Sequence, residues 1–261
     1  MSIVTAIILG IIQGTTEFLP VSSSGHLIVI PKLLNIDSGG FSFDAFLHLA
    51  TGLAIVSYFF PDYKKLLTKA LAKDKSAQKQ VTYLIIGCIP AGIIGLIFGD
   101  FIENKMRGEF VVAGALFIVA LAIILVEKYL KNQKREVVTK KDGVIVGLSQ
   151  VLALIPGVSR SGITIISGMA GGLTREASAK FSFMLATPIV LLVGAYSFYQ
   201  ALPYLDYNQL LSYAVGFITA FFAGIFSIEF LLSYVKTKSL MPFAIYRIAL
   251  ASIVIVTAIF L

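Results

Sequence analysis

The chain has a single cysteine and few charged residues, and both shortages narrow its class. One cysteine, Cys88, excludes an intramolecular disulfide. Charged residues make up only 13% of the 261 residues, whereas 57% are hydrophobic and the mean hydropathy is +0.91. No water-soluble core needs so much apolar material, so the composition indicates a polytopic helical membrane protein. The first six residues also lack the basic stretch of a cleaved signal peptide, so we expect Met1 to be retained.

Long hydrophobic runs predict six membrane-spanning helices. Each run approaches or exceeds the roughly 20 residues that cross a bilayer. The runs lie near residues 44–60, 80–99, 110–127, 180–202, 210–232 and 240–261.

Basic residues gather in alternate connections between these runs. They cluster between residues 62 and 80, between residues 128 and 142, and at Lys236 and Lys238, whereas 203–209 contains none. The positive-inside rule therefore places these three connections in the cytoplasm. We expect the membrane to be the plasma membrane. Attraction to anionic membrane lipids accounts for the net charge of +7, so we do not expect nucleic acid as a partner.

Two short polar strings, Gln13–His26 and Gln150–Gly162, interrupt the hydrophobic sequence and resemble each other. Polar and charged groups are costly at membrane depth, so their presence there indicates a functional site. Duplication is the simplest explanation of the similarity. At a constant offset of 137 residues, Gln13 matches Gln150, Val21 matches Val158, Ser22 matches Ser159, Ser24 matches Ser161 and Gly25 matches Gly162.

The orientation of the spanning helices assigns a re-entrant hairpin to each polar string. Residues 1–42 must start and finish on the outer side, while residues 143–172 must enter from the cytoplasmic side and return to it. We therefore predict one all-α membrane domain over residues 1–261, built from two inverted repeats of about 1–127 and 143–261. Each repeat has one hairpin and three spanning helices, and the hairpin tips meet near the membrane centre.

The strings have the composition of an anion-binding site. Serine can cap a helix and glycine allows close backbone approach, so each string would present the positive end of a half-helix to a ligand. Arg160 adds a planar fork that suits phosphate oxygens. Two simpler interpretations remain: the serines serve only as helix caps, or Arg160 forms a structural ion pair with Glu17. The predicted substrate-binding residues are Gln13, Ser22, Ser24, Gly25, Ser159, Ser161 and Gly162.

The first string also has residues suited to acid–base, nucleophilic or metal chemistry. Gln13 and Glu17 are four residues apart and share a helical face, which makes them candidate metal ligands. His26 follows Ser23 by three residues, close enough to take its proton and make it a nucleophile. We predict Glu17, Ser23, His26 and Arg160 as the catalytic residues.

Three further polar residues lie in predicted spanning helices. We expect His48 to be structural or to line a pocket. We expect Glu229 to be buried, and Arg247 to extend to the membrane surface or to bind a lipid phosphate.

These motifs resemble those of the undecaprenyl pyrophosphate phosphatase family, also described as bacitracin resistance proteins. The segment Gln13–His26 is similar to the family's first signature, and Pro156–Gly162 is similar to its second. The ending Pro242–Arg247 also resembles the family, so the likeness covers nearly the whole chain. Position 13 is glutamine where many members have glutamate, which removes a charge from a two-carboxylate metal site.

The resemblance implies removal of the terminal phosphate from a C55 polyprenyl pyrophosphate at the outer face, which recycles a lipid carrier for cell-wall glycans. It also implies a divalent cation such as Mg²⁺ or Ca²⁺, and it points to Glu17, Ser23, His26 and Arg160. The attacking group stays open between Ser23 and a water molecule activated by His26 or Glu17. Prenyl length, homodimer formation and transfer of the product across the bilayer also stay open.

Two other functions compete with this one. Inverted repeats with re-entrant hairpins are typical of carriers, so the chain could transport an anion or flip a polyprenyl phosphate. Its motifs also faintly resemble the phosphatidic acid phosphatase class, but the second histidine motif and the Lys and Arg-Pro motif of that class are absent.

Overall fold

The computed structural model describes residues 1–130 and 132–260, with all of their side chains except those of Asp100, Glu103 and Asn104. Lys131, in the second basic connection, and Leu261 lie outside the described residues. The described chain is α-helical, and its β geometry is limited to one isolated bridge between Arg135 and Leu173. The helices are α1 (Ile3–Phe18), α2 (Ser23–Leu34), α3 (Gly40–Leu71), α4 (Lys75–Lys105), α5 (Glu109–Tyr129), α6 (Lys140–Leu152), α7 (Arg160–Ala170), α8 (Arg175–Ala201), α9 (Leu210–Tyr234) and α10 (Met241–Phe260), with the 3-10 turns η1 (Leu202–Tyr204) and η2 (Tyr207–Gln209) between α8 and α9.

Six of these helices are long and apolar enough to cross a membrane, which confirms the predicted all-α fold class. They are α3, α4, α5, α8, α9 and α10. Helices α3 and α4 continue well past their apolar runs into the lysine-rich segment, leaving only residues 72–74 between them. Lysine, leucine and alanine favour helix there, and the Asp74 carboxylate caps α4 by accepting from the backbone of Ser76 and Ala77.

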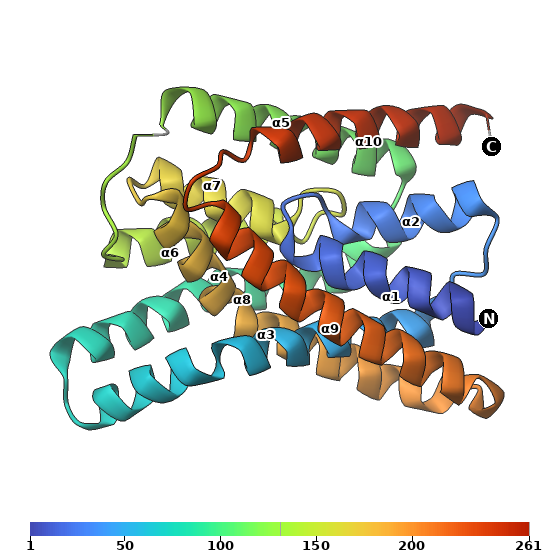
Figure 1. Cartoon of the computed structure of the whole chain (residues 1–261), viewed down its shortest axis with the longest axis horizontal. Coiled ribbons are helices and arrows are strands. Elements are labelled where there is room, and N and C mark those ends of the chain that lie inside the picture. Colours follow the sequence, from blue (N-terminus) through green and yellow to red (C-terminus); the bar gives the residue numbers. More distant parts are fainter. Residues whose placement is uncertain (131, 261) are drawn as a thin grey trace.

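The four remaining helices form two hairpins, α1–α2 and α6–α7. They contain 16, 12, 13 and 11 residues. At about 1.5 Å per residue, none of them reaches across a hydrocarbon core of about 30 Å. In Figure 1 the two hairpins enter from opposite ends of the molecule, and their turns come together half-way along it.

Glycines bring each hairpin close to a long helix of the other half of the chain. Helix α1 packs along α9, and a Cβ on Gly14 would lie 2.5 Å from the Ala220 carbonyl oxygen. Helix α6 packs along α4 in the same way, where a Cβ on Gly147 would lie 2.6 Å from the Gly87 Cα. The pairs α3–α8 and α5–α10 also lie side by side, so the two halves of the chain interlock.

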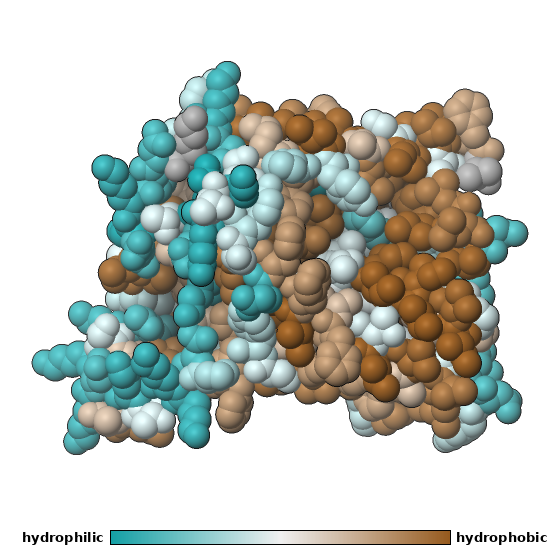
Figure 2. Space-filling view, viewed as in Figure 1, coloured by the Kyte–Doolittle hydropathy of each residue, from teal (hydrophilic) through white to brown (hydrophobic). Residues whose placement is uncertain are grey.

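The polar surface gathers at one end of the molecule. Figures 1 and 2 place the α3–α4, α5–α6 and α9–α10 connections at the left, where the surface is hydrophilic, while apolar side chains cover the middle and right. Two expectations for polar residues in the long helices are wrong. Glu229 is exposed, at a site where the Tyr58 hydroxyl donates to it, and Arg247 is fully buried.

Candidate active site

The two hairpin turns have the same backbone geometry at matched serines. Ser22 (φ 75°, ψ 101°) and Ser159 (φ 69°, ψ 109°) both have positive φ, which is uncommon for a residue with a Cβ. The hydroxyl of each serine accepts from a glycine N–H three residues later, Gly25 at 3.4 Å and Gly162 at 3.2 Å. The similarity of the two strings therefore extends to three dimensions, and these serine caps begin α2 and α7.

Two other matched serines join the turns to each other. The Ser24 hydroxyl accepts from the Gly157 N–H at 3.2 Å, and the Ser161 hydroxyl donates to the Leu19 carbonyl at 3.0 Å. Gly157 has φ of 95°, and a Cβ there would lie 2.5 Å from the Val112 carbonyl oxygen, so only glycine fits this turn. These bonds assign a structural role to Ser24 and Ser161, and their contact with substrate stays a prediction.

An ion pair joins the end of α1 to the start of α7. Nη2 of Arg160 lies 3.2 Å from Oε1 of Glu17, and the two side chains are only 13% and 12% exposed. The ion pair that the sequence left open as a simpler role of Arg160 is therefore present, and it joins the two hairpins. Nη1 of Arg160 is buried and has no hydrogen-bond partner in the described chain. A buried guanidinium N–H without a partner is costly, so the pair leaves a donor ready for an anionic ligand.

The Glu17 carboxylate also receives bonds from two other predicted residues. Its Oε2 accepts from the Ser23 hydroxyl at 2.9 Å and from the Gln13 amide at 3.2 Å. Glu17 is therefore placed to take the proton of Ser23.

His26 makes different contacts from those its spacing suggested. Its Nδ1 donates to the Ser22 carbonyl at 2.7 Å, and its Nε2 lies 2.6 Å from the Tyr246 hydroxyl, with the two rings parallel. Because a carbonyl oxygen can only accept, Nδ1 carries a proton, and the Tyr246 hydroxyl donates to Nε2 of the neutral ring. His26 thus lies next to Ser23 in α2, but its hydrogen bonds join it to α10.

Arg247 holds the two turns in place. It is fully buried and donates to the carbonyls of Pro20 in the first turn and of Gly157 and Val158 in the second, at 3.3, 2.9 and 3.1 Å. Its other bonds reach two carbonyls of α5. Arg247 does not extend to the membrane surface because these backbone acceptors replace water around its charge.

A cavity of about 170 Å³ opens beside the ion pair. Glu17, Arg160, His48 and Gln150 contribute its polar wall, and α4, α8 and the α6 tip contribute an apolar wall. The side-chain oxygen of Gln150 is buried without a hydrogen-bond partner in the described chain, as is that of nearby Gln13. Unpaired donors and acceptors around one cavity are what a binding site for a polar ligand requires.

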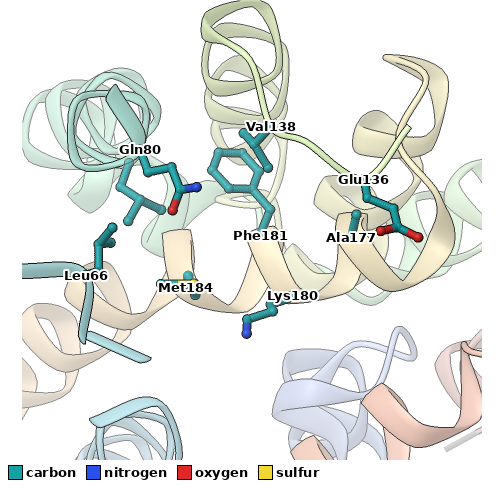
Figure 3. A pocket seen from close by; sticks show the side chains of 9 residues that line it. Leu66, Gln80, Glu136, Val138, Ala177, Lys180, Phe181 and Met184 are labelled. Atoms are coloured by element: carbon teal, nitrogen blue, oxygen red, sulfur yellow. The ribbon is translucent and has the colours of Figure 1, made fainter. Parts of the chain in front are cut away.

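A larger cavity of about 270 Å³ lies elsewhere, between α3, α4, α8 and the α5–α6 connection. Figure 3 shows Gln80, Phe181 and Met184 around it, with Lys180 and Glu136 at its edge. Lys180 is already paired with Asp62 at 2.6 Å. No residue of either polar string lines this cavity, so the smaller one is the candidate active site.

Comparison with known proteins identifies the family of this chain. Residues 6–253 match the family described as Bacitracin resistance protein BacA. The chain belongs to this family. A protein of Elusimicrobium minutum, named undecaprenyl-diphosphatase, is 40% identical over 99% of this chain and 99% of its own length. Proteins of Moorella thermoacetica and Marinobacter nauticus with the same name are 38% and 37% identical, over 98% and 97% of this chain and 97% and 98% of their own.

Membership of the BacA family confirms the resemblance inferred from the motifs, and it does not favour the phosphatidic acid phosphatase class. The sequence alone missed the places of Tyr246 and Gln150 in the site, whereas the expectation that His48 lines a pocket is confirmed. Tyr246 and His48 lie far from both strings in sequence, and only the packing of α10 and α3 brings them to His26 and Gln13. Gln150 was recognised as the match of Gln13, but no role was assigned to it.

Proposed function

We propose that the protein is a membrane phosphatase that hydrolyses undecaprenyl pyrophosphate to undecaprenyl phosphate and inorganic phosphate. The observation that carries this proposal is the Glu17–Arg160 pair, which both hairpins build beside a cavity and which leaves one guanidinium donor unused. The names of the relatives support the same activity. The apolar wall of the cavity, with Ala91, Leu154 and Val193, suits the first prenyl units of such a lipid.

In the proposed mechanism Arg160 binds the diphosphate and Ser23 attacks it. Arg160 Nη1 donates to phosphate oxygens and stabilises the charge of the transition state. Ser23 Oγ forms a bond to the terminal phosphorus while its proton passes to Oε2 of Glu17, the hydrogen-bond partner at 2.9 Å. The anhydride P–O bond breaks and undecaprenyl phosphate leaves with its electron pair. Water then hydrolyses the phosphoserine, releases inorganic phosphate and restores the serine hydroxyl.

His26 has a supporting role in this scheme. Both of its ring nitrogens are engaged, by the Ser22 carbonyl and the Tyr246 hydroxyl, so it holds the start of α2 in position while Glu17 acts as the base. Direct attack by water is the alternative. A trapped phosphoserine at Ser23 would support the serine mechanism. A Ser23→Ala protein with ordinary turnover would refute that mechanism and support direct attack by water.

We propose that Glu17 and Gln13 hold a divalent cation, Mg²⁺ or Ca²⁺, together with the substrate. Their donor set is one carboxylate and one buried, unpartnered amide oxygen, which fits a hard cation. The described chain has no cluster of three acidic, histidine or cysteine ligands, so substrate phosphates and water must complete the coordination. The cation, when bound, would neutralise part of the diphosphate charge.

We propose that the site serves the outer face of the plasma membrane. The three basic connections lie at one end of the molecule, and the positive-inside rule assigns that end to the cytoplasm. The α1–α2 hairpin, with Gln13, Glu17 and Ser23, then enters from the outer side as a re-entrant element. The matched geometry of Ser22 and Ser159, in hairpins that come from opposite ends of the molecule (Figure 1), supports an inverted repeat.

Phosphate release from a purified sample tests the proposed function. Farnesyl or undecaprenyl pyrophosphate is incubated with protein in detergent, with and without chelator, and inorganic phosphate is measured. We expect release that needs the cation, and a loss of about 10²–10⁴-fold in turnover for Glu17→Gln, which keeps the size of the side chain but removes the base. Absence of release with Mg²⁺ or Ca²⁺ present would refute the phosphatase and favour a carrier.

A further inference from the structure

His48 lies in the wall of the candidate active site, which confirms the expectation that it lines a pocket. It belongs to α3 and lines the cavity with Glu17, Gln150 and Arg160. Tight packing of α3 against α8 sets its position, because a Cβ on Gly194 would lie only 2.9 Å from the His48 carbonyl oxygen. The backbone that carries His48 therefore has little freedom to move.

The Gln13 amide determines which nitrogen of His48 carries the proton. The Gln13 nitrogen lies 3.1 Å from Nδ1 of His48 and 3.2 Å from Oε2 of Glu17. An ionised carboxylate can only accept, so the amide must present its NH₂ group to Glu17 and, with its second hydrogen, to His48. Nδ1 of His48 is then an acceptor, and the neutral ring carries its proton on Nε2.

The opposite orientation of the Gln13 amide is unfavourable. It would place the amide oxygen against the Glu17 carboxylate, two acceptors at 3.2 Å without a hydrogen between them. The bond to Glu17 thus sets the orientation of Gln13, and Gln13 in turn sets the tautomer of His48. No hydrogen bond of the described chain uses Nε2 of His48, so its N–H is free for a ligand.

We propose that His48 is a substrate-binding residue whose Nε2–H donates a hydrogen bond to the diphosphate, beside the Arg160 guanidinium. This inference rests on the proposed function, since it takes the diphosphate as the ligand of the cavity. The hydrogen bonds of the Glu17–Gln13–His48 chain orient this donor. His48 is not a general base here, because Gln13 occupies its Nδ1 and a proton occupies its Nε2.

Substitution of His48 by glutamine and by leucine tests whether its side chain must accept from Gln13 and donate to the diphosphate. A glutamine at position 48 can accept from Gln13 and still donate to phosphate, whereas leucine can do neither. We expect His48→Gln to keep kcat/KM for farnesyl pyrophosphate within about threefold of the original, and His48→Leu to lose about 10–100-fold, a typical cost of one charge-assisted hydrogen bond. The control is Tyr58→Phe, which removes a hydrogen bond of α3 to Glu229, away from the cavity, and should leave turnover unchanged.

Binding of inorganic pyrophosphate, measured by calorimetry on the full chain in detergent, tests the same contact without turnover. We expect the Kd to rise about tenfold or more in His48→Leu and to change little in His48→Gln. Unchanged pyrophosphate binding in a folded His48→Leu protein would overturn the proposal, as would a His48→Gln protein as impaired as His48→Leu. Failure of the proposed function appears differently, as a wild-type protein that releases no phosphate from any prenyl pyrophosphate.

Discussion

Replacing Arg247 by methionine should separate the two hairpin turns. Arg247 donates to the carbonyls of Pro20, Gly157 and Val158, and no other hydrogen bond of the described chain reaches these three oxygens. Each buried acceptor left without a partner costs about 1–3 kcal/mol. Three such acceptors together cost about 3–9 kcal/mol. Because methionine does not bury a charge, part of this cost is offset, and we expect the free energy of unfolding to fall by about 3–6 kcal/mol.

Thermal unfolding in detergent, followed by circular dichroism, measures this loss. We expect Arg247→Met to lower the Tm by roughly 10–20 °C and to abolish phosphate release, because the turns also carry Glu17 and Arg160. Arg160→Met is the matched control. Its guanidinium bonds to Glu17 and, in the described chain, to no backbone carbonyl of the turns, so this variant should lose turnover while its Tm falls less than that of Arg247→Met.

Two results would refute this reasoning. An Arg247→Met protein with an unchanged Tm would show that water or a backbone shift satisfies the three carbonyls. An Arg247→Met protein with a lowered Tm but full turnover at low temperature would show that Glu17 and Arg160 keep their positions without the hydrogen bonds of Arg247.

Three other changes test separate contacts. Tyr246→Phe removes the hydroxyl that donates to His26 Nε2. Because this bond orients the histidine, we expect kcat to fall about tenfold with an unchanged Tm. An unchanged kcat would show that the bond is not needed for turnover. Asp142→Asn should cost about 3 kcal/mol of stability, because the buried carboxylate accepts two bonds from Arg135, at 2.5 and 2.7 Å, and two from Thr139. Although burial raises the pKa of Asp142, the bonds from Arg135 and Thr139 hold it below its ordinary value. Its stabilisation should therefore be complete above about pH 4 and lost as the pH falls further, and Asp142→Asn should remove that dependence in a Tm series against pH. Gly14→Ala should force α1 away from α9, since its Cβ would lie 2.5 Å from the Ala220 carbonyl, and a Tm equal to that of wild type would contradict this packing.

The long helices could be predicted because hydrophobicity is a property of each segment by itself. Six runs of sufficient length lead to six helices, and local caps such as Asp74, at the start of α4, set their ends. The two similar polar strings could also be predicted, because comparison of the sequence with itself finds the matched serines at a constant offset. Re-entry of the hairpins into a membrane, the repeat boundaries and the cation stay predictions.

Contacts between distant segments could not be predicted in the same way. Spacing within one helix suggested that His26 serves Ser23, yet Ser23 bonds to Glu17 and His26 to Tyr246, 220 residues away. Arg247 was expected at the surface because an arginine in an apolar helix usually extends to water. Its actual partners are backbone carbonyls, whose availability depends on the conformation of both turns.

The sequence by itself determined the class of protein, the six long helices and the family, because composition, segment hydrophobicity and motifs can be read along the chain. It offered the pairing of Glu17 with Arg160 only as one interpretation, and the packing of the two hairpins decided it. Tertiary structure alone decided the directions of the hydrogen bonds within the site. Gln13 donates to His48, Tyr246 to His26, and Arg247 to both turns, because helices far apart in the chain pack at distances that glycines such as Gly14 and Gly194 permit. Directional bonds depend on positions accurate to tenths of an ångström, and only the packed helices supply them.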